Sequence, residues 1–471
     1  MPFDTHFIQE TLSGVSILYG TCPQNPTFAV DSRGVKPGDI FIALPGEKVN
    51  GHSFVESALR NGASGVIVAH DQQGVIDACD KKLLKDKFVL SVPEPLDALI
   101  TLARAWRAQF SYPVLAITGS VGKTSTKELL THIVGLAGKK YLSSQGNQNT
   151  LIGVAINILR LGHEHEGALF EVGINKRGEM ERIADLLRPT YALITNIGHA
   201  HMEGLGSLSD IALEKRSLFS YFTEKSIGIV NGDQPVLAHV SYRHPVLKFG
   251  SKTTNQVQAR KISISGAHIS FILKMYQKKY QIDIKQSHAG VIFNSLAAAS
   301  AAHLLNIPVE LIVEGIQQSL VVNRRFEQRA LADHKGVLID DCYNANPESM
   351  KAALLAFQEI KTKAPKVAIL GDMLELGVDS PFWHRQLGRF LRKTPSLDKV
   401  ILVGDLVKWT KKTAPVGLVV DLVSSWEQAV ECLEKAIDNQ EVAVLVKGSN
   451  AVGLSNLVEK FAAKRIQLGG L

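Results

Sequence analysis

Residues 118–125, T-G-S-V-G-K-T-S, have side chains and spacing suited to binding the phosphates of a nucleotide. Glycine backbone can approach an anion closely, a lysine can neutralise the outer phosphates, and a threonine hydroxyl suits Mg²⁺. The usual G-x-x-x-x-G-K-[ST] pattern is not met, because its first glycine falls on Ile117. We nevertheless predict a loop for a nucleoside triphosphate, with the alternative of a tight turn that carries G-K-T by chance. The predicted residues are Gly119, Ser120, Val121, Gly122, Lys123, Thr124 and Ser125.

Acidic and imidazole groups follow the next two predicted strands. Glu171 ends the apolar run G-A-L-F-E, and His199 and His201 come just after Y-A-L-I-T-N. Ligands gather at the carboxyl ends of strands in an open parallel sheet, and a carboxylate there could hold Mg²⁺. A surface glutamate and two structural histidines are the alternative.

The order of elements predicts how these groups are positioned. From about Ser111, strands and helices alternate, including a helix from about Lys123, and this pattern is typical of a parallel sheet covered by helices. A second α/β unit follows residues 318–329, with a helix from about Pro347, and residues 261–287 alternate like antiparallel strands. The first hundred or so residues mix short elements, and residues 30–44 predict strand, turn, strand.

Composition narrows the class of protein. A chain of 471 residues exceeds one ordinary core, so two to four domains are expected. The four cysteines lack metal-ligand spacing, which favours free thiols in a reducing compartment. The N-terminal sequence does not resemble a signal peptide, and no apolar run reaches about 18 residues. The net charge of +7 suits an acidic ligand, but the charges are dispersed, so nucleic acid is not predicted.

The shortened loop, T-G-x-x-G-K-T-[ST], resembles that of the Mur ligase family, ATP-dependent amide-forming enzymes that include the folylpolyglutamate synthases. In that family a glutamate, a histidine and a carbamylated lysine organise two Mg²⁺ ions. The resemblance implies Glu171, His201 in H-M-E-G-L-G-S, and Lys215 in I-A-L-E-K-R-S-L-F, together with Thr124. A lysine that captures CO₂ becomes an anionic oxygen ligand, which requires a locally deprotonated amine. The alternative for Lys215 is a solvated charge on a helix.

Three further stretches resemble the family member that adds D-alanyl-D-alanine to a UDP-N-acetylmuramoyl-tripeptide, giving a peptidoglycan precursor. They lie at 143–161, 338–354 and 368–384 and contain G-N-Q-N-T-L-I-G-V, D-D-C-Y-N-A-N-P-E-S-M and L-G-D-M-L-E-L-G-V-D-S. Residues 31–54 resemble the UDP-binding domain that this member shares with the tripeptide-forming ligase. The D-N-P-R motif of the tripeptide-forming ligase does not occur in the sequence. The alternatives are another amide ligase of the superfamily, tripeptide-forming or folylpolyglutamate type, and a non-catalytic nucleotide-binding regulator.

The resemblance implies three α/β domains. These are a small mixed UDP-binding domain at 1–110, a central P-loop ATPase-like domain with a parallel sheet at 111–318, and a Rossmann-like domain at 319–471 that closes over ATP and binds the dipeptide. It further implies a cytoplasmic enzyme, a monomer not inserted in a membrane, that activates the tripeptide as an acyl phosphate.

Motif matches assign the family's remaining ligand contacts to residues of this chain. Where the family has G-x-H-N-V-x-N this chain reads G-V-I-F-N at 290–294, Arg324 replaces a glycine, and Asn450 stands where arginine is common. For ATP the resemblance implies Asn294, Arg325 and Asn344, and for the UDP-linked substrate it implies Ser32, Arg33, Gly46, Asn147 and Asn149.

Overall fold

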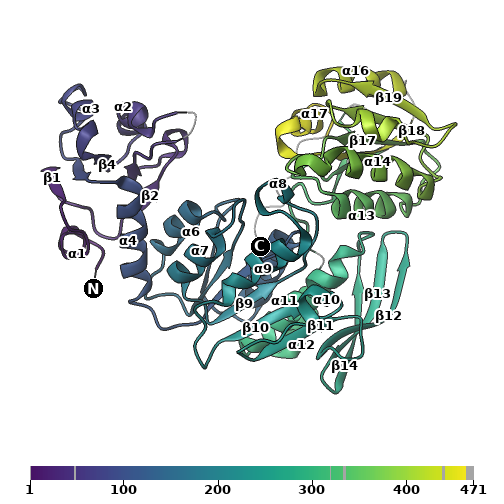
Figure 1. Ribbon diagram of the computed structural model, residues 1–471, viewed down its shortest axis with the longest axis horizontal. Helices are drawn as coiled ribbons and strands as arrows, with labels where there is room; N and C mark the ends of the chain where they lie inside the picture. Colours follow the sequence, from purple (N-terminus) through teal and green to yellow (C-terminus); the bar gives the residue numbers. More distant parts are fainter. Residues whose placement is uncertain (1, 47–48, 319, 333–335, 438–440, 463–471) are drawn as a thin grey trace.

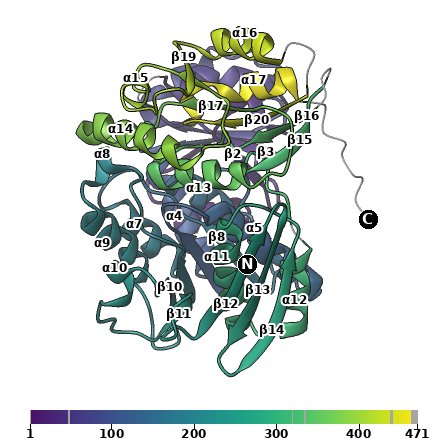
Figure 2. The same cartoon turned by 90° about the vertical axis from the view of Figure 1, so that its right-hand side faces the viewer.

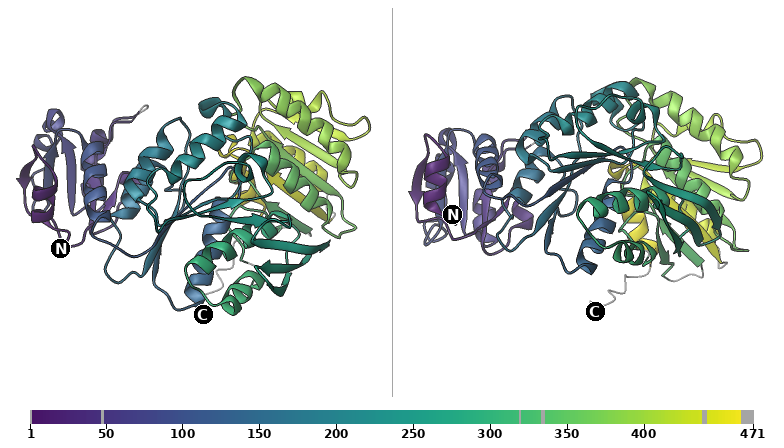
Figure 3. Two further views of the ribbon diagram at one scale, coloured as in Figure 1. Left: turned by 60° about the horizontal axis from the view of Figure 1, so that its bottom comes forward. Right: turned by 90° about the horizontal axis from the view of Figure 1, so that it is seen from below.

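The computed structural model describes residues 2–46, 49–318, 320–332, 336–437 and 441–462. Three α/β bodies follow one another along the long axis of the molecule, and the N-terminal and C-terminal bodies lie on either side of the central one (Figure 1). The same arrangement is seen from below (Figure 3). The predicted three-domain α/β class is therefore confirmed. The predicted boundaries stay a prediction, and the three sheets lie within residues 16–92, 114–284 and 327–447.

The N-terminal body has a five-stranded sheet in the order β1-β5-β4-β3-β2, parallel except for β1. Its strands are β1 (Ser16–Tyr19), β2 (Thr27–Ala29), β3 (Asp39–Ile42), β4 (Gly65–Ala69) and β5 (Phe88–Val92). Its helices are α1 (Thr5–Thr11), α2 (Val55–Arg60), α3 (Gly74–Asp77) and α4 (Pro95–Arg107), with the 3₁₀ turns η1 (Ser32–Gly34), η2 (Gly51–Phe54) and η3 (His70–Gln72).

The prediction of strand, turn and strand over 30–44 was wrong in its first part. The second strand is β3, but the first strand, β2, ends before residue 30. Residues 32–34 form η1 instead, because the side chain of Asp31 accepts a hydrogen bond from the backbone N–H of Arg33 at 3.0 Å and caps the turn. Aspartate favours such local capping over an extended ladder.

Helix α4 joins the first two bodies. Trp106 packs its ring 5.2 Å from that of Phe3 and donates its indole N–H to the carbonyl of Leu161 at 3.0 Å. Buried Arg107 likewise donates to the carbonyl of Leu187 at 2.9 Å. The same helix therefore contributes to the cores of both bodies.

The central body has a nine-stranded sheet in the order β14-β13-β12-β11-β10-β9-β6-β8-β7. The strands from β7 to β12 in this order are parallel, whereas β12, β13 and β14 are antiparallel, as residues 261–287 predict. The strands are β6 (Val114–Thr118), β7 (Tyr141–Ser143), β8 (Gly167–Glu171), β9 (Tyr191–Ile194), β10 (Ile227–Asn231), β11 (Val246–Gly250), β12 (Val257–Ser265), β13 (His268–Met275) and β14 (Lys278–Ile284).

Helices cover both faces of this sheet (Figure 2). Buried hydrophobic side chains form two separate clusters in this body. The helices are α5 (Lys123–Leu136), α6 (Leu151–Ile158), α7 (Glu179–Leu187), α8 (Met202–Leu205), α9 (Leu208–Arg216), α10 (Pro235–Ala238), α11 (Gly290–Leu304) and α12 (Val309–Gln317), with the turn η4 (Ser217–Phe219). Strand β6 is fully buried in the middle of the sheet, which fixes the position of the loop that follows it.

The C-terminal body has a six-stranded sheet in the order β15-β16-β20-β17-β18-β19, parallel except for β15. Its strands are β15 (Glu327–Ala330), β16 (Gly336–Asp340), β17 (Lys366–Gly371), β18 (Lys399–Val403), β19 (Val419–Val423) and β20 (Val442–Lys447). Its helices are α13 (Pro347–Gln358), α14 (Ser380–Phe390), α15 (Lys408–Lys411), α16 (Trp426–Ile437) and α17 (Leu454–Phe461), with the turns η5 (Gly377–Asp379), η6 (Leu391–Lys393) and η7 (Asn450–Val452). In the part of the chain that is described, no helix is long and apolar enough to cross a membrane.

Candidate active site

The predicted phosphate loop connects β6 to the N-terminus of α5. Gly119 and Gly122 have φ angles of +149° and +84°, which favour glycine. The backbone N–H of Val121 donates to the side chain of Asn196 at 2.8 Å, and the hydroxyl of Ser120 donates to the carbonyl of Gly198 at 3.0 Å. The loop after β9 therefore holds the phosphate loop in place, with its glycines at the start of a helix whose N–H groups attract anions.

Replacing Gly119 by alanine is expected to abolish tight nucleotide binding. A Cβ there would lie 1.9 Å from Oγ1 of Thr195, at a backbone conformation that other residues adopt only with strain of about 1–3 kcal/mol. Calorimetric titration with ADP measures the effect. The matched control is Gly135→Ala inside α5, where a Cβ meets nothing within 4 Å. That variant should bind ADP normally and be more stable by about 0.5–1 kcal/mol. Equal ADP affinity in both variants would contradict the assignment of the loop.

Lys123 lies between the phosphate loop and several charged groups. Its Nζ donates to the carbonyl of Gly119 at 2.9 Å, so the amine folds back over the loop. Although the side chain as a whole is only partly buried, its amine is deep in the site, and this burial lowers the pKa of Lys123. The carboxylates of Glu171 and Glu375 favour its charged form, and Arg325 opposes it. The lysine is thus placed to meet an anion.

Glu171 ends β8 and is 2% exposed. Its Oε1 accepts a hydrogen bond from the side-chain amide of Asn149 at 2.9 Å, and its backbone N–H donates to Ser144 Oγ at 2.9 Å. Its other oxygen, Oε2, is buried and has no hydrogen-bond partner among the described residues. A buried carboxylate oxygen without a partner is costly, and a bound cation would satisfy it.

His201 follows β9 and precedes α8, in a left-handed conformation with φ of +58°. Its Nδ1 lies 2.6 Å from Oε2 of Glu375 in the C-terminal body, at ion-pair distance but without the alignment of a hydrogen bond. This contact with His201 is the main reason why the pKa of Glu375 lies below its usual value. One ring nitrogen of His201 therefore faces a carboxylate from another domain.

Lys215 is buried in α9, with 1% of its side chain exposed, and is not the solvated helix charge that sequence alone allows. Burial holds the pKa of its amine well below the usual value, and the nearby charge of Lys123 lowers it further. A neutral amine is the form that reacts with CO₂. The lowered pKa therefore shifts the amine of Lys215 toward the form that carbamylation requires.

The C-terminal body adds groups on the other side of the phosphate loop. Arg325 donates to the hydroxyl of Thr124 at 3.3 Å and stacks its guanidinium 3.9 Å from the ring centre of Tyr343. Lys447 forms a buried ion pair with Asp341 at 2.8 Å and donates to the carbonyl of Asn344 at 3.0 Å. Thr124 therefore already has a partner in this arrangement.

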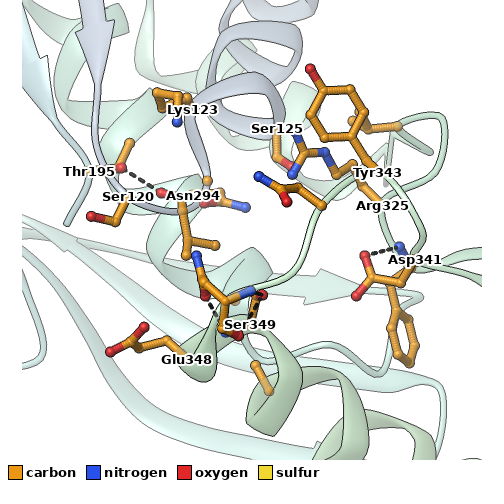
Figure 4. A pocket seen from close by; sticks show the side chains of 18 of the residues that line it. Ser120, Lys123, Ser125, Thr195, Asn294, Arg325, Asp341, Tyr343, Glu348 and Ser349 are labelled. Atoms are coloured by element: carbon orange, nitrogen blue, oxygen red, sulfur yellow. Dashed lines mark hydrogen bonds between the residues drawn. The ribbon is translucent and has the colours of Figure 1, made fainter. Parts of the chain in front are cut away.

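A cavity of about 980 Å³ lies between the central and C-terminal bodies, and side chains from both surround it (Figure 4). It brings together most of the residues predicted for ATP, metal and peptide. Those that line it are Ser120, Val121, Gly122, Lys123, Ser125, Asn147, Asn149, Glu171, His201, Asn294, Arg325 and Asn344. Gly119, Thr124 and Lys215 are not among the lining residues; the first two belong to the phosphate loop, and the amine of Lys215 is near that of Lys123.

Asn294 packs against the phosphate loop from α11. A Cβ at Gly122 would lie 2.4 Å from its Oδ1, and the hydroxyl of Thr126 is 3.5 Å from the same oxygen. Asn294, the asparagine that the G-V-I-F-N stretch shares with the family's motif, therefore contacts the phosphate loop.

Three predicted substrate residues lie outside this cavity, on the N-terminal body. Ser32 is buried in η1, Arg33 is exposed and paired with Asp31 at 2.6 Å, and the N–H of Gly46 donates to the carbonyl of Val49 at 3.0 Å. The cavity and these residues therefore sit on different domains, and a ligand that reaches both must be long.

Sequence reasoning missed several groups in the cavity, above all Tyr343, Glu348 and Glu375. Glu348 and Glu375 belong to the motifs around residues 340–350 and 370–380, but nothing in their spacing indicates a contact with histidines of the central body. Among the described residues no group of three His, Cys, Asp or Glu side chains is arranged to hold a metal ion. The predicted magnesium ligands would not form such a group, because only Glu171 and His201 are of these residue types and the third side chain is that of Lys215.

An α/β architecture with a glycine-rich phosphate loop and buried acidic and lysine groups is typical of enzymes that use a nucleoside triphosphate, and comparisons with known proteins specify the class. Family models match in three stretches: Mur ligase family, catalytic domain at 28–107; Mur ligase middle domain at 117–302; and Mur ligase, glutamate ligase domain at 324–450.

Individual relatives match along nearly the whole chain. The UDP-N-acetylmuramoyl-tripeptide–D-alanyl-D-alanine ligase of Bacillus subtilis is 30% identical over 92% of each chain. A crystal structure of MurF from Acinetobacter baumannii superimposes with a TM-score of 0.83, at 28% identity and 98% coverage of both chains. MurF ligase from Thermotoga maritima in complex with ADP gives a TM-score of 0.76 at 26% identity, covering 92% of this chain and 96% of that one. The chain belongs to the Mur ligase family.

Proposed function

We propose that this protein is an ATP-dependent ligase that joins D-alanyl-D-alanine to UDP-N-acetylmuramoyl-tripeptide, forming the pentapeptide precursor of peptidoglycan, ADP and phosphate. The observation that carries the proposal is the cavity in which Lys123 and the buried carboxylate of Glu171 meet Arg325 from the C-terminal body. The relatives that match along the whole chain, named as ligases for this dipeptide, support the same choice.

The reaction first joins a carboxylate oxygen of the tripeptide to the γ-phosphorus of ATP, releasing ADP. The amine of the dipeptide then attacks the acyl carbon, loses a proton, and displaces phosphate. Both reacting groups in the first step are anions, so cations must bring them together. Lys123 and the N–H groups at the start of α5 would bind the phosphates, and Arg325 would contribute a further cation from the other domain; the contacts of Lys123 with Gly119 and of Arg325 with Thr124 support these roles.

Mg²⁺ would be held by Glu171, His201 and carbamylated Lys215, with Thr124 as a further ligand. The unpartnered Oε2 of Glu171 and the neutral-prone amine of Lys215 fit this role. Bound there, Mg²⁺ would stabilise negative charge that develops on the phosphates. Asn149 would orient Glu171, to which it donates a hydrogen bond.

The N-terminal body, residues 1–110, would bind the UDP group through Ser32, Arg33 and Gly46, and Asn147 and Asn149 would lie near the peptide end of the same substrate. Residues 111–318 would bind ATP, with Asn294 against the phosphate loop. Residues 319–471 would close over it and bind the dipeptide. Exclusion of water matters because an acyl phosphate hydrolyses readily. Supply of ATP favours a cytoplasmic location, and we expect a monomer.

The acceptor is expected to be D-alanyl-D-alanine and not a free diamino acid. The motivation is the N-A-N-P-E-S-M stretch, whose Asn346 caps α13 beside the cavity, and the lack of D-N-P-R in the sequence. Phosphate release should require ATP, the UDP-linked tripeptide and the dipeptide together. L-lysine or meso-diaminopimelate with the UDP-linked dipeptide should give no release above background.

The reverse pattern would contradict this choice and favour the tripeptide-forming reaction. Release with a folate and glutamate would favour the folylpolyglutamate type. Nucleotide binding with no release under any of these conditions would favour a regulator without ligase chemistry.

A further inference from the structure

Two acid–histidine pairs connect the C-terminal body to the loop that follows β9. In the first pair, Glu348, which lies in the first turn of α13, makes two contacts with His199. One carboxylate oxygen lies 2.5 Å from Nδ1 and the other accepts the backbone N–H at 3.2 Å. The ring of His199 also packs 4.1 Å from that of Trp383 in α14. The loop is thereby fixed to two helices of the other domain.

The second pair is His201 and Glu375, two residues further along the same loop. Besides the contact of 2.6 Å between Nδ1 and Oε2, the backbone carbonyl of Glu375 accepts the N–H of Glu203 at 3.1 Å. The backbone at Gly377 also packs on Glu203, since a Cβ on that glycine would lie 3.3 Å from the Cα of Glu203. The backbone at residues 375–377 therefore packs directly against the backbone at Glu203.

Both members of the second pair have a left-handed backbone. His201 has φ of +58° and Glu375 has φ of +62°. Residues other than glycine adopt this conformation at a cost of about 1–2 kcal/mol each, and such strain concentrates at functional sites. Here these two backbone conformations place the imidazole of His201 beside the carboxylate of Glu375, across a domain boundary.

We propose that Glu375 is a positioning residue that orients His201 for metal binding only when the C-terminal domain is docked. This rests on the proposed function, in which His201 is a ligand of Mg²⁺. Histidines that bind metals commonly present their second ring nitrogen to a carboxylate, which sets the tautomer and raises the basicity of the ligand nitrogen. A carboxylate 2.6 Å from Nδ1 favours the tautomer that carries its proton on that nitrogen, which leaves the lone pair on Nε2 for the metal.

The consequence is a link between domain docking and assembly of the metal site. In an undocked molecule His201 would lose the carboxylate, and its loop would lose the two contacts from Glu348. Metal affinity would therefore fall when the domains separate. The enzyme would then assemble its phosphate-activating site fully only when the domain proposed to carry the dipeptide is in place, which would limit wasteful hydrolysis of ATP.

Binding of Mn²⁺ in place of Mg²⁺ tests this without an activity assay. Electron paramagnetic resonance would measure bound Mn²⁺ in the full-length protein saturated with a non-hydrolysable ATP analogue. Glu375→Ala should weaken Mn²⁺ binding about tenfold or more, because loss of such carboxylates typically costs 10- to 100-fold in metal affinity. Glu375→Gln, which keeps the shape of the side chain, should give a smaller loss in the same direction.

Glu203→Ala is the matched control, because it removes an exposed carboxylate two residues from His201 and keeps the backbone N–H that Glu375 accepts. It should bind Mn²⁺ like the wild type. His201→Ala sets the scale of the loss. If His201→Ala weakens binding and both Glu375 variants match the wild type, the positioning role is wrong and the proposed metal site stands. If His201→Ala has no effect either, the proposed metal site is itself wrong.

Discussion

Replacing Lys123 by alanine is expected to abolish ligation while the protein remains folded. The amine lies over the phosphate loop, bound to the carbonyl of Gly119, where it would meet the β,γ-phosphates of ATP. Loss of a single group that stabilises developing charge commonly lowers kcat by about 100- to 1,000-fold, and here the lost group carries a full charge. Phosphate release with all three substrates measures the effect, and the melting temperature and circular dichroism report the fold.

A matched control is Lys225→Ala, which removes an exposed lysine from the central body. It should retain wild-type activity. Ligation at the wild-type rate in folded Lys123→Ala would refute the assignment of this loop to ATP.

Replacing Lys215 by alanine is expected to remove most of the activity, and short carboxylic acids such as acetate should restore part of it. An unmodified ammonium beside Mg²⁺ would repel the metal, whereas a carbamate supplies oxygen ligands. The structure strengthens this expectation, because the amine is buried and burial holds its pKa well below the usual value. Rates are measured with and without added acid, over a range of acid concentrations.

The comparison with Lys123→Ala separates rescue from a general effect of the acid. Lys123→Ala loses a cation, so no acid should restore it. Removing bicarbonate should also slow the wild-type enzyme if the carbamate exchanges during the assay. Full activity of Lys215→Ala, or equal rescue of both variants, would exclude the carbamate.

Local patterns in the sequence predicted the parts of the site that one segment builds. The phosphate loop directly follows the buried strand β6, and Glu171 is the last residue of the buried strand β8. Both features were therefore predicted from an apolar run and the residues at its end. The start of α13 at Pro347 follows from its capping residue and proline. Each of these signals lies within a few residues of the feature that it predicts.

The contacts between domains could not be predicted in this way. His199 and Glu348 are 149 positions apart, and Thr124 and Arg325 are 201 apart, so no periodicity or spacing joins them. The pair of His201 and Glu375 further depends on two strained backbone conformations, which side-chain type does not reveal. The burial of Lys215 was likewise hidden, because a lysine near the end of a helix is usually solvated.

Oxygen transfer tests the proposed reaction most directly. The tripeptide carboxylate that is joined would be labelled with ¹⁸O at both oxygens and incubated with the enzyme, ATP and D-alanyl-D-alanine. Attack on the γ-phosphorus followed by displacement at the acyl carbon predicts one ¹⁸O in each phosphate released and one in the new amide. Unlabelled phosphate beside a formed amide, or label in AMP, would contradict activation through an acyl phosphate.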